Sequence, residues 1–115
     1  MTFTASNLDS GALRIAIEGE LDAVTVGDVR KEVDRICELR PKRVEVDLSK
    51  LRMVDSSGVG AIVSLYKRVR AQDGVVVIMG LRDQPLAIFR LLRLDRVMTG
   101  GDLRAPGGSV PTARS

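Results

Sequence analysis

The sequence predicts an α/β domain, with a small mixed β-sheet and helices packed on it. Alternating apolar residues indicate half-buried strands over 13–17 and 43–48, and a continuous apolar run over 75–79 indicates a strand covered on both faces. Helical apolar spacing follows each of these segments. Only two phenylalanines and one tyrosine are present, so valine, leucine and isoleucine must build the core. This strand–helix alternation is typical of α/β domains.

The first strand should end near Gly19, and the segment 19–22 should lead into the first helix. Thr25 is a candidate N-cap for that helix, with Asp28 three residues later. The pair Arg40-Pro41 ends it, because proline disfavours a helical residue before it. Four residues at helical spacing define its inner face: Val29, Val33, Ile36 and Cys37.

The second helix is expected from about Gly58 to Ala71, and Asp83 is expected to cap a third helix that has Pro85 in its first turn. A last short strand is expected around Val97. The apolar face of the third helix comprises Leu86, Ile88, Phe89, Leu91, Leu92 and Leu94.

Length and composition favour one domain followed by a tail. A chain of 115 residues can bury a substantial core. Glycine, proline and small polar residues dominate after residue 99, so we expect residues 1–99 to form the domain and residues 100–115 to be disordered. The 18 basic and 15 acidic residues give a net charge of only +3, which argues against nucleic-acid binding. We expect a monomer or a weak homodimer.

The sequence also predicts a cytoplasmic location without membrane insertion. No apolar run approaches the roughly 18 residues that a membrane helix needs. The first residues, Met1-Thr2-Phe3-Thr4-Ala5, lack the basic and apolar regions of a secretory signal. Cys37 is the single cysteine and lies among apolar positions, so we expect a buried structural thiol.

The chain contains no histidine, which excludes several classes of active site. A Ser-His-Asp triad, a Cys-His dyad and a histidine-rich zinc site all require that residue. We therefore expect no enzymatic activity, no metal and no cofactor. Ser64 and Lys67 match a serine-x-x-lysine string, but they lie in the middle of the second predicted helix and lack the scaffold of that enzyme class.

The most informative segment is Asp55-Ser56-Ser57-Gly58, which follows the second strand and precedes the second helix. Serine, aspartate and glycine at such a place serve in many proteins only to cap the helix. The unpaired N–H groups and the dipole of a helix N-terminus also favour a negative group. A phosphate on serine would fit there, so the segment indicates a phosphorylation switch rather than a catalytic centre.

A second acidic turn, Glu20-Leu21-Asp22, stands at the end of another strand. Loops that follow neighbouring parallel strands can converge at one edge of a sheet. Asp22 and Asp55 are therefore expected to lie near Ser57, where they could orient its hydroxyl or hold a metal–nucleotide.

The chain resembles the STAS domains (sulfate transporter and anti-sigma factor antagonist), especially the bacterial anti-anti-sigma factors. The resemblance rests on three motifs, and it covers roughly residues 8 to 100. The motifs are Gly19-Glu20-Leu21-Asp22, Val46-Asp47-Leu48-Ser49 and Met53-Val54-Asp55-Ser56-Ser57-Gly58-Val59-Gly60.

The resemblance implies a partner-switching regulator of transcription in bacterial stress responses. In such proteins the serine before the glycine, here Ser57, is phosphorylated by an anti-sigma factor that is itself a serine kinase of the GHKL type. The unphosphorylated antagonist binds this kinase and frees a sigma factor, whereas the phosphorylated form releases it. A PPM-type serine phosphatase resets the switch. By the same resemblance Asp22 and Asp55 line the phosphoacceptor site, and Ser56 is an accessory or alternative acceptor.

The predicted contact surface comprises the Ser57 loop, the Asp22 loop and the start of the second helix. Gly58 and Gly60 would permit close approach of a partner backbone, and Val59 and Val63 would add apolar contacts. Other functions remain open at this stage. They are a scaffold subunit of a larger signalling complex, an accessory subunit of a lipid or anion transporter, and a nucleotide-binding role for the two aspartate loops.

Overall fold

The computed structural model describes residues 1–94, which contain five strands and three helices. In chain order these are β1 (Thr2–Asn7), β2 (Ala12–Leu21), α1 (Val26–Glu38), β3 (Arg43–Asp47), β4 (Leu51–Val54), α2 (Ser56–Ala71), β5 (Val75–Met79) and α3 (Asp83–Leu91). The expected α/β class, a mixed sheet with helices packed on it, is confirmed.

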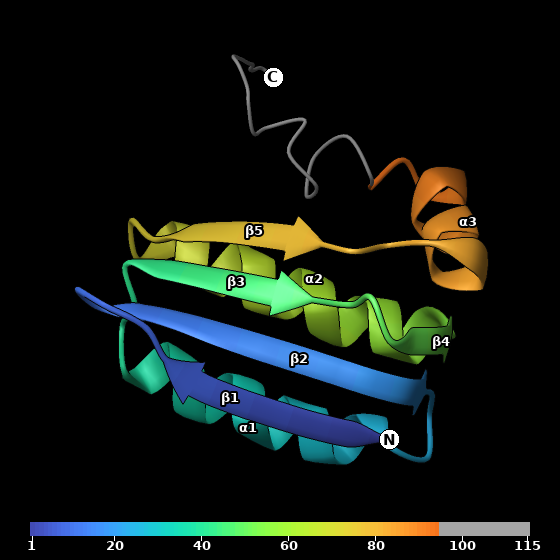
Figure 1. Ribbon diagram of the computed structural model, residues 1–115, viewed down its shortest axis with the longest axis horizontal. Coiled ribbons are helices and arrows are strands. Elements are labelled where there is room, and N and C mark those ends of the chain that lie inside the picture. Colours follow the sequence, from blue (N-terminus) through green and yellow to red (C-terminus); the bar gives the residue numbers. More distant parts are fainter. Residues whose placement is uncertain (95–115) are drawn as a thin grey trace.

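The sheet has the order β1-β2-β3-β5, and β4 pairs with the end of β2. β1 runs antiparallel to β2, whereas β2, β3, β4 and β5 are parallel to their neighbours. Helices α1 and α2 cover one face of the sheet, and α3 lies at the end where β4 is found (Figure 1). The carboxyl ends of β2 and β4 therefore lie together, which is the arrangement that converging loops require.

The core lies between the sheet and the two helices that cover it. Within residues 1–94 the buried side chains are apolar, without a buried charged or polar residue among them. Cys37 is only 2% exposed, and burial raises the pKa of its thiol. The expectation of a buried structural cysteine is confirmed. Phe89 is fully buried and anchors α3 to this core.

The other sheet face carries the polar residues that alternate with the core positions. Arg14 on β2 pairs with Glu45 at 3.1 Å and with Asp47 at 3.4 Å, both on β3. Arg43 pairs with Glu45 at 3.1 Å. The backbone N–H of Ser49, together with its hydroxyl and the Arg14 guanidinium, holds the pKa of Asp47 below its ordinary value. The two Arg14 pairs join β2 to β3 and support their register, whereas the Arg43–Glu45 pair lies within β3.

Two strands of the structure, β1 and β4, were not predicted from the sequence pattern. The β1 segment has five exposed residues and one half-buried residue, Phe3, so it lacks the alternation by which a strand is found. β4 is only four residues long and shows burial at its two ends alone, at Leu51 and Val54. β2 also runs two residues past the predicted end, because a register shift after Gly19 lets it pair with β4.

The helix ends differ from the predicted ones in detail. α2 begins at Ser56, two residues earlier than expected, and α3 ends at Leu91, before Leu92 and Leu94. The predicted third helix is present, but Asp83 is its first residue rather than its cap: Arg82 occupies the N-cap position and makes no side-chain cap hydrogen bond. The first helix likewise lacks the predicted side-chain cap from Thr25. The strand expected around Val97 and the whole of the predicted tail, residues 100–115, lie outside the described residues.

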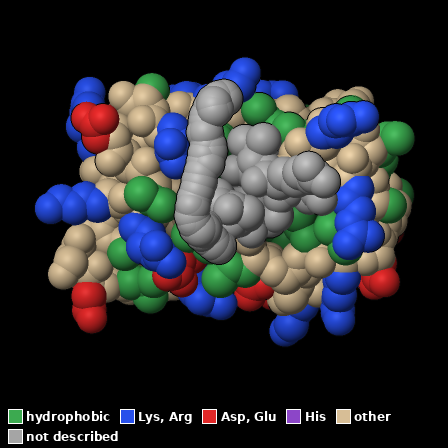
Figure 2. Space-filling view, turned by 90° about the horizontal axis from the view of Figure 1, so that it is seen from above, with side chains coloured by type: hydrophobic (Ala, Val, Ile, Leu, Met, Phe, Trp, Pro, Cys, Tyr) green, Lys and Arg blue, Asp and Glu red, His purple; other side chains and the backbone are tan. Residues whose placement is uncertain are grey.

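Two surface observations bear on partner classes. Seen from the β5 side, lysine and arginine side chains outnumber acidic ones but are dispersed rather than gathered into one patch (Figure 2). Among residues 1–94 no helix is both long enough and apolar enough to cross a membrane.

Candidate functional site

The turn from β4 into α2 is held by Asp55, the N-cap residue. Its carboxylate Oδ1 accepts a hydrogen bond from the backbone N–H of Gly58 at 3.0 Å. Ser56 and Ser57 are the first two residues of the helix; Ser56 is exposed and Ser57 is half-buried. The first turn of α2 itself contains no acidic residue, and the negative group at the positive end of the helix dipole is the N-cap carboxylate of Asp55. The serines therefore lie at a helix N-terminus, as predicted.

The second loop is organised by Asp22, directly after β2. Its Oδ1 accepts from the backbone N–H groups of Val24 at 3.0 Å and Thr25 at 3.1 Å. The Thr25 hydroxyl oxygen in turn accepts from the backbone N–H of Asp22 at 3.1 Å. Thr25 does occupy the N-cap position of α1, but its side chain makes no cap hydrogen bond. The Asp22 carboxylate, three residues earlier, instead accepts hydrogen bonds from the backbone N–H groups that lead into the helix.

The two loops are joined by the same Asp55 carboxylate. Its second oxygen, Oδ2, accepts from the backbone N–H of Ala23 at 3.1 Å, so one side chain ties both loops together. The backbone N–H of Asp55 also donates to the carbonyl of Leu21 at 3.1 Å. The predicted convergence of the two loops is therefore present in the structure.

The carboxylates do not orient the serine hydroxyl in the way the sequence suggested. Both oxygens of Asp55 and one oxygen of Asp22 accept from backbone N–H groups. Within the described residues no hydrogen bond joins the Ser57 hydroxyl to either carboxylate. The same part of the chain contains no cluster of three acidic, cysteine or histidine residues that could hold a metal ion.

Gly58 and Val59 lie in the interior and do not face a partner. A Cβ built on Gly58 would lie 2.6 Å from Val54 Cγ2 and 2.7 Å from Leu21 Cγ. Val59 is 4% exposed. Gly58 thus permits close packing of α2 on the paired ends of β2 and β4, and the accessible part of the predicted surface is reduced to Ser56, Ser57, Gly60, Val63 and the Asp22 loop.

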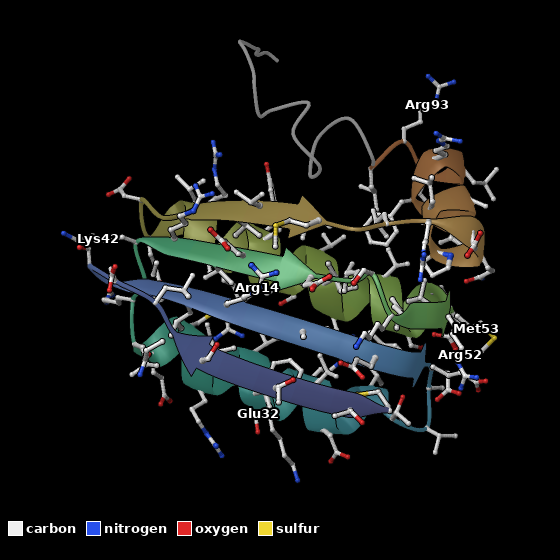
Figure 3. All side chains as sticks on the ribbon, viewed as in Figure 1. Arg14, Glu32, Lys42, Arg52, Met53 and Arg93 are labelled. Carbon is white, nitrogen blue, oxygen red and sulfur yellow. The ribbon has the colours of Figure 1, made fainter. Side chains whose placement is uncertain are left out.

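Two exposed apolar side chains beside these loops were not singled out in the sequence. Val24 is 90% exposed at the tip of the Asp22 loop, and Met53 is 36% exposed on β4. Figure 3 shows Met53 at the β4 end of the molecule, next to Arg52. The signal in the sequence was a large apolar residue, Val24, in the short turn between β2 and α1. Such side chains are suited to contact with another protein.

The outer edge of β4 is occupied by a side chain of α3. The Gln84 carboxamide accepts from the backbone N–H of Val54 at 2.9 Å and donates to the Val54 carbonyl at 3.0 Å. These are the two bonds that a neighbouring strand would make. Because Val54 directly precedes Asp55, Gln84 fixes the position from which the serine loop begins.

Replacing Gln84 with methionine keeps the side-chain length but removes both hydrogen bonds. We expect the free energy of unfolding to fall by about 1–2 kcal/mol, since a donor and an acceptor on the β4 edge lose their partners. Urea denaturation measures this loss, and hydrogen exchange should show a faster Val54 amide. Arg90→Met, at an exposed position of the same helix, serves as the control. Equal stability of the two variants would contradict the importance of the Gln84 bonds.

Acid should weaken the Asp22 loop. The backbone N–H of Thr25, and then that of Val24 and the Thr25 hydroxyl, hold the pKa of Asp22 below its ordinary value of 3.8 against the opposing effect of desolvation. A lowered pKa means that the ionised carboxylate stabilises the folded state above pH 3.8. This contribution is lost as the pH falls through the folded-state pKa.

The thermal midpoint of the wild type should therefore decrease more steeply in acid than that of Asp22→Asn, in which this titration is absent. Circular dichroism melts between about pH 7 and about pH 2.5 measure both slopes. If the thermal midpoints of the two proteins changed with pH at the same slope, ionisation of Asp22 would not contribute to the stability of the fold. Asp47 titrates in both proteins and so cancels from the comparison.

The comparisons with known proteins agree with this architecture. The family model described as the STAS domain matches residues 6–105. The chain is 32% identical over 89 residues to the anti-sigma F factor antagonist of Paenibacillus polymyxa, covering 76% of both chains. It is 26% identical over 90 residues to the anti-sigma-B factor antagonist of Listeria monocytogenes, covering 78% of this chain and 79% of that protein.

The fold also matches a solved structure. The Bacillus cell fate determinant SpoIIAA in its phosphorylated form superposes with a TM-score of 0.70 at 20% identity, covering 85% of this chain and 89% of that chain. At this identity the match supports the fold alone. With the family match across most of its length, and with both loops in place at the ends of β2 and β4, the chain belongs to the STAS domain family.

Proposed function

We propose that this protein is an anti-sigma factor antagonist, a binding protein rather than an enzyme, and that phosphorylation of Ser57 controls its binding. The single observation that carries the proposal is the place of Ser57, in the first turn of α2 beside a second loop tied to it by Asp55. The named antagonists of Paenibacillus and Listeria support the general role. SpoIIAA, which shares the fold, has been solved in a phosphorylated form.

The proposed partner is an anti-sigma factor that is itself a serine kinase of the GHKL type. The surface it would contact comprises the exposed part of the α2 start and the Asp22 loop, with Val24 and Met53 as apolar contacts. Two grooves with volumes of about 350 and 370 Å³, among those lined by described residues, lie near the other end of the sheet, between β1, the start of β2 and the end of α1.

Phosphorylation can release the partner without a large conformational change. The phosphate brings about two negative charges next to Asp55 and the Asp22 loop. The N–H groups at the start of α2 stabilise that charge on this protein. An acidic partner surface would be repelled by it, and docking would also require the removal of water from the phosphate, at an additional cost in free energy. A PPM-type serine phosphatase would restore the binding form, and a cytoplasmic setting would bring these partners together.

A capture experiment with three baits tests this function. Ser57→Ala, Ser57→Glu and wild-type protein are incubated with lysate of the cells that produce the chain, and bound proteins are identified by mass spectrometry. We expect a GHKL-type serine kinase on the alanine bait and its loss from the glutamate bait. Enzymatically phosphorylated wild type should behave like the glutamate bait. The same partner on all baits would refute the switch and favour a scaffold or transporter-linked role.

A further inference from the structure

The outer edge of β1 forms the side of the sheet farthest from β5. Among residues 1–94 no strand pairs with this edge, and α1 lies behind it (Figure 1). The described chain ends at Leu94, after α3, on the other side of the sheet. The backbone N–H and C=O groups along the outer side of β1 are therefore available for pairing.

This edge lacks the features by which edge strands usually avoid pairing. The strand has six residues, Thr2-Phe3-Thr4-Ala5-Ser6-Asn7, with neither a charged residue nor a proline. Its register with β2 is continuous from Thr2 to Asn7, without a bulge. A long, uncharged and regular edge is a template for an additional strand.

A groove runs beside this strand and is bordered by α1. Its lining combines Phe3 and Ala5 of β1 with Glu32, Arg35 and Leu39 of the helix region. Leu39 is 65% exposed, although it is a large apolar residue. Glu32 and Arg35 are 3.7 Å apart on the same turn of the helix, and Figure 3 shows Glu32 beside the free edge.

The charges of the groove are complementary to themselves under twofold symmetry. α1 runs in the same direction as β1 (Figure 1). A twofold axis perpendicular to the sheet, placed just outside the free edge of β1 and level with the middle of the strand, therefore makes both elements antiparallel to their copies. Glu32 of one copy then faces Arg35 of the other, and the reverse pair forms on the other side of the axis. The uncharged strand adds no charge repulsion between the two copies.

We propose that the edge of β1 is a self-association surface, on which a second copy of this chain adds its own β1 antiparallel to form one continuous sheet. This inference is independent of the proposed function. The twofold arrangement leaves the two Ser57 loops at opposite ends of the joined sheet, so both sites stay accessible. The occupant is a second copy because the acid and base of one groove match those of its symmetry mate.

Sedimentation velocity of the full chain at concentrations up to about 1 mM tests the proposal. We expect the mass to rise from the 12.5 kDa of one chain toward twice that value. Glu32→Arg and Arg35→Glu should each weaken self-association at least tenfold, that is by about 1.4 kcal/mol or more, because like charges then face each other. An equimolar mixture of the two variants should associate again, because one chain then presents two basic side chains at these positions and the other presents two acidic ones.

Lys67→Glu, at an exposed position of α2, is the matched control for the charge change in Arg35→Glu. It should leave the association of the wild type intact. A wild-type chain that stays at 12.5 kDa throughout the series would overturn the proposal. So would a dimer that neither charge variant weakens, because that dimer would use another surface. Recovery in the mixture also shows that the single variants are folded.

Discussion

Glutamate or phosphoserine at position 57 is expected to weaken binding to the proposed anti-sigma factor by about 30- to 1000-fold. This range corresponds to an unfavourable change of about 2–4 kcal/mol in binding free energy. The new charge lies in the first turn of α2, next to the Asp55 carboxylate that joins both loops. Ser57→Ala should bind as the unmodified protein does. Surface plasmon resonance with the captured partner measures the affinities.

Two further variants assign the effect to this serine. Ser56→Glu adds the same charge one residue earlier, at an exposed position, and distinguishes the alternative acceptor. Ser10→Glu adds it in the turn between β1 and β2, which lies at the other end of the sheet from the serine loop, and should leave affinity unchanged. If Ser10→Glu weakened binding as much as Ser57→Glu, the effect would reflect net charge rather than a local switch.

Gly58→Ala is expected to destabilise the fold by about 3 kcal/mol. The added Cβ would lie 2.6 Å from Val54 Cγ2 and 2.8 Å from the Leu21 carbonyl oxygen, and neither atom belongs to a flexible side-chain end. At a helix position with free space around it, glycine to alanine would stabilise the fold by about 0.5–1 kcal/mol. The sign of the measured change therefore distinguishes a crowded position from an open one. Urea denaturation followed by circular dichroism measures the change.

Gly60→Ala, two residues later in the same helix, is the matched control. A Cβ there would lie 3.5 Å from an Arg30 guanidinium nitrogen, which is an ordinary contact, so this variant should be slightly more stable than the wild type. If Gly58→Ala and Gly60→Ala changed the free energy of unfolding by the same amount and in the same direction, close packing around position 58 would not explain why glycine occupies it.

Periodicity predicts an element when one of its faces is buried and the element is long enough to show it. β2 and α1 satisfy this condition, because their core residues recur at the strand and helix periods. β1 does not, since its partner contacts are mostly backbone hydrogen bonds that carry no side-chain signal. β4 is too short to show a period, and its strand conformation depends on pairing with the distant end of β2.

The place of the site was predictable, but its internal bonding was not. The sequence placed Ser57 at a helix start and brought the Asp22 loop to the same edge, because both follow from strand order. The roles of Asp55 and Gln84 could not be predicted in this way. Asp55 bonds to a residue 32 positions away and Gln84 to one 30 positions away. Local patterns contain no information on such distant pairs.

The serine loop is shaped by groups other than the serine. The Asp55 carboxylate and the Gln84 carboxamide both bond to backbone atoms, and Gly58 fits because it has no side chain. Folding therefore places few demands on the side chain at position 57. If Ser57 is the proposed switch residue, its side chain can be exchanged to change partner binding without a compensating change elsewhere to restore stability.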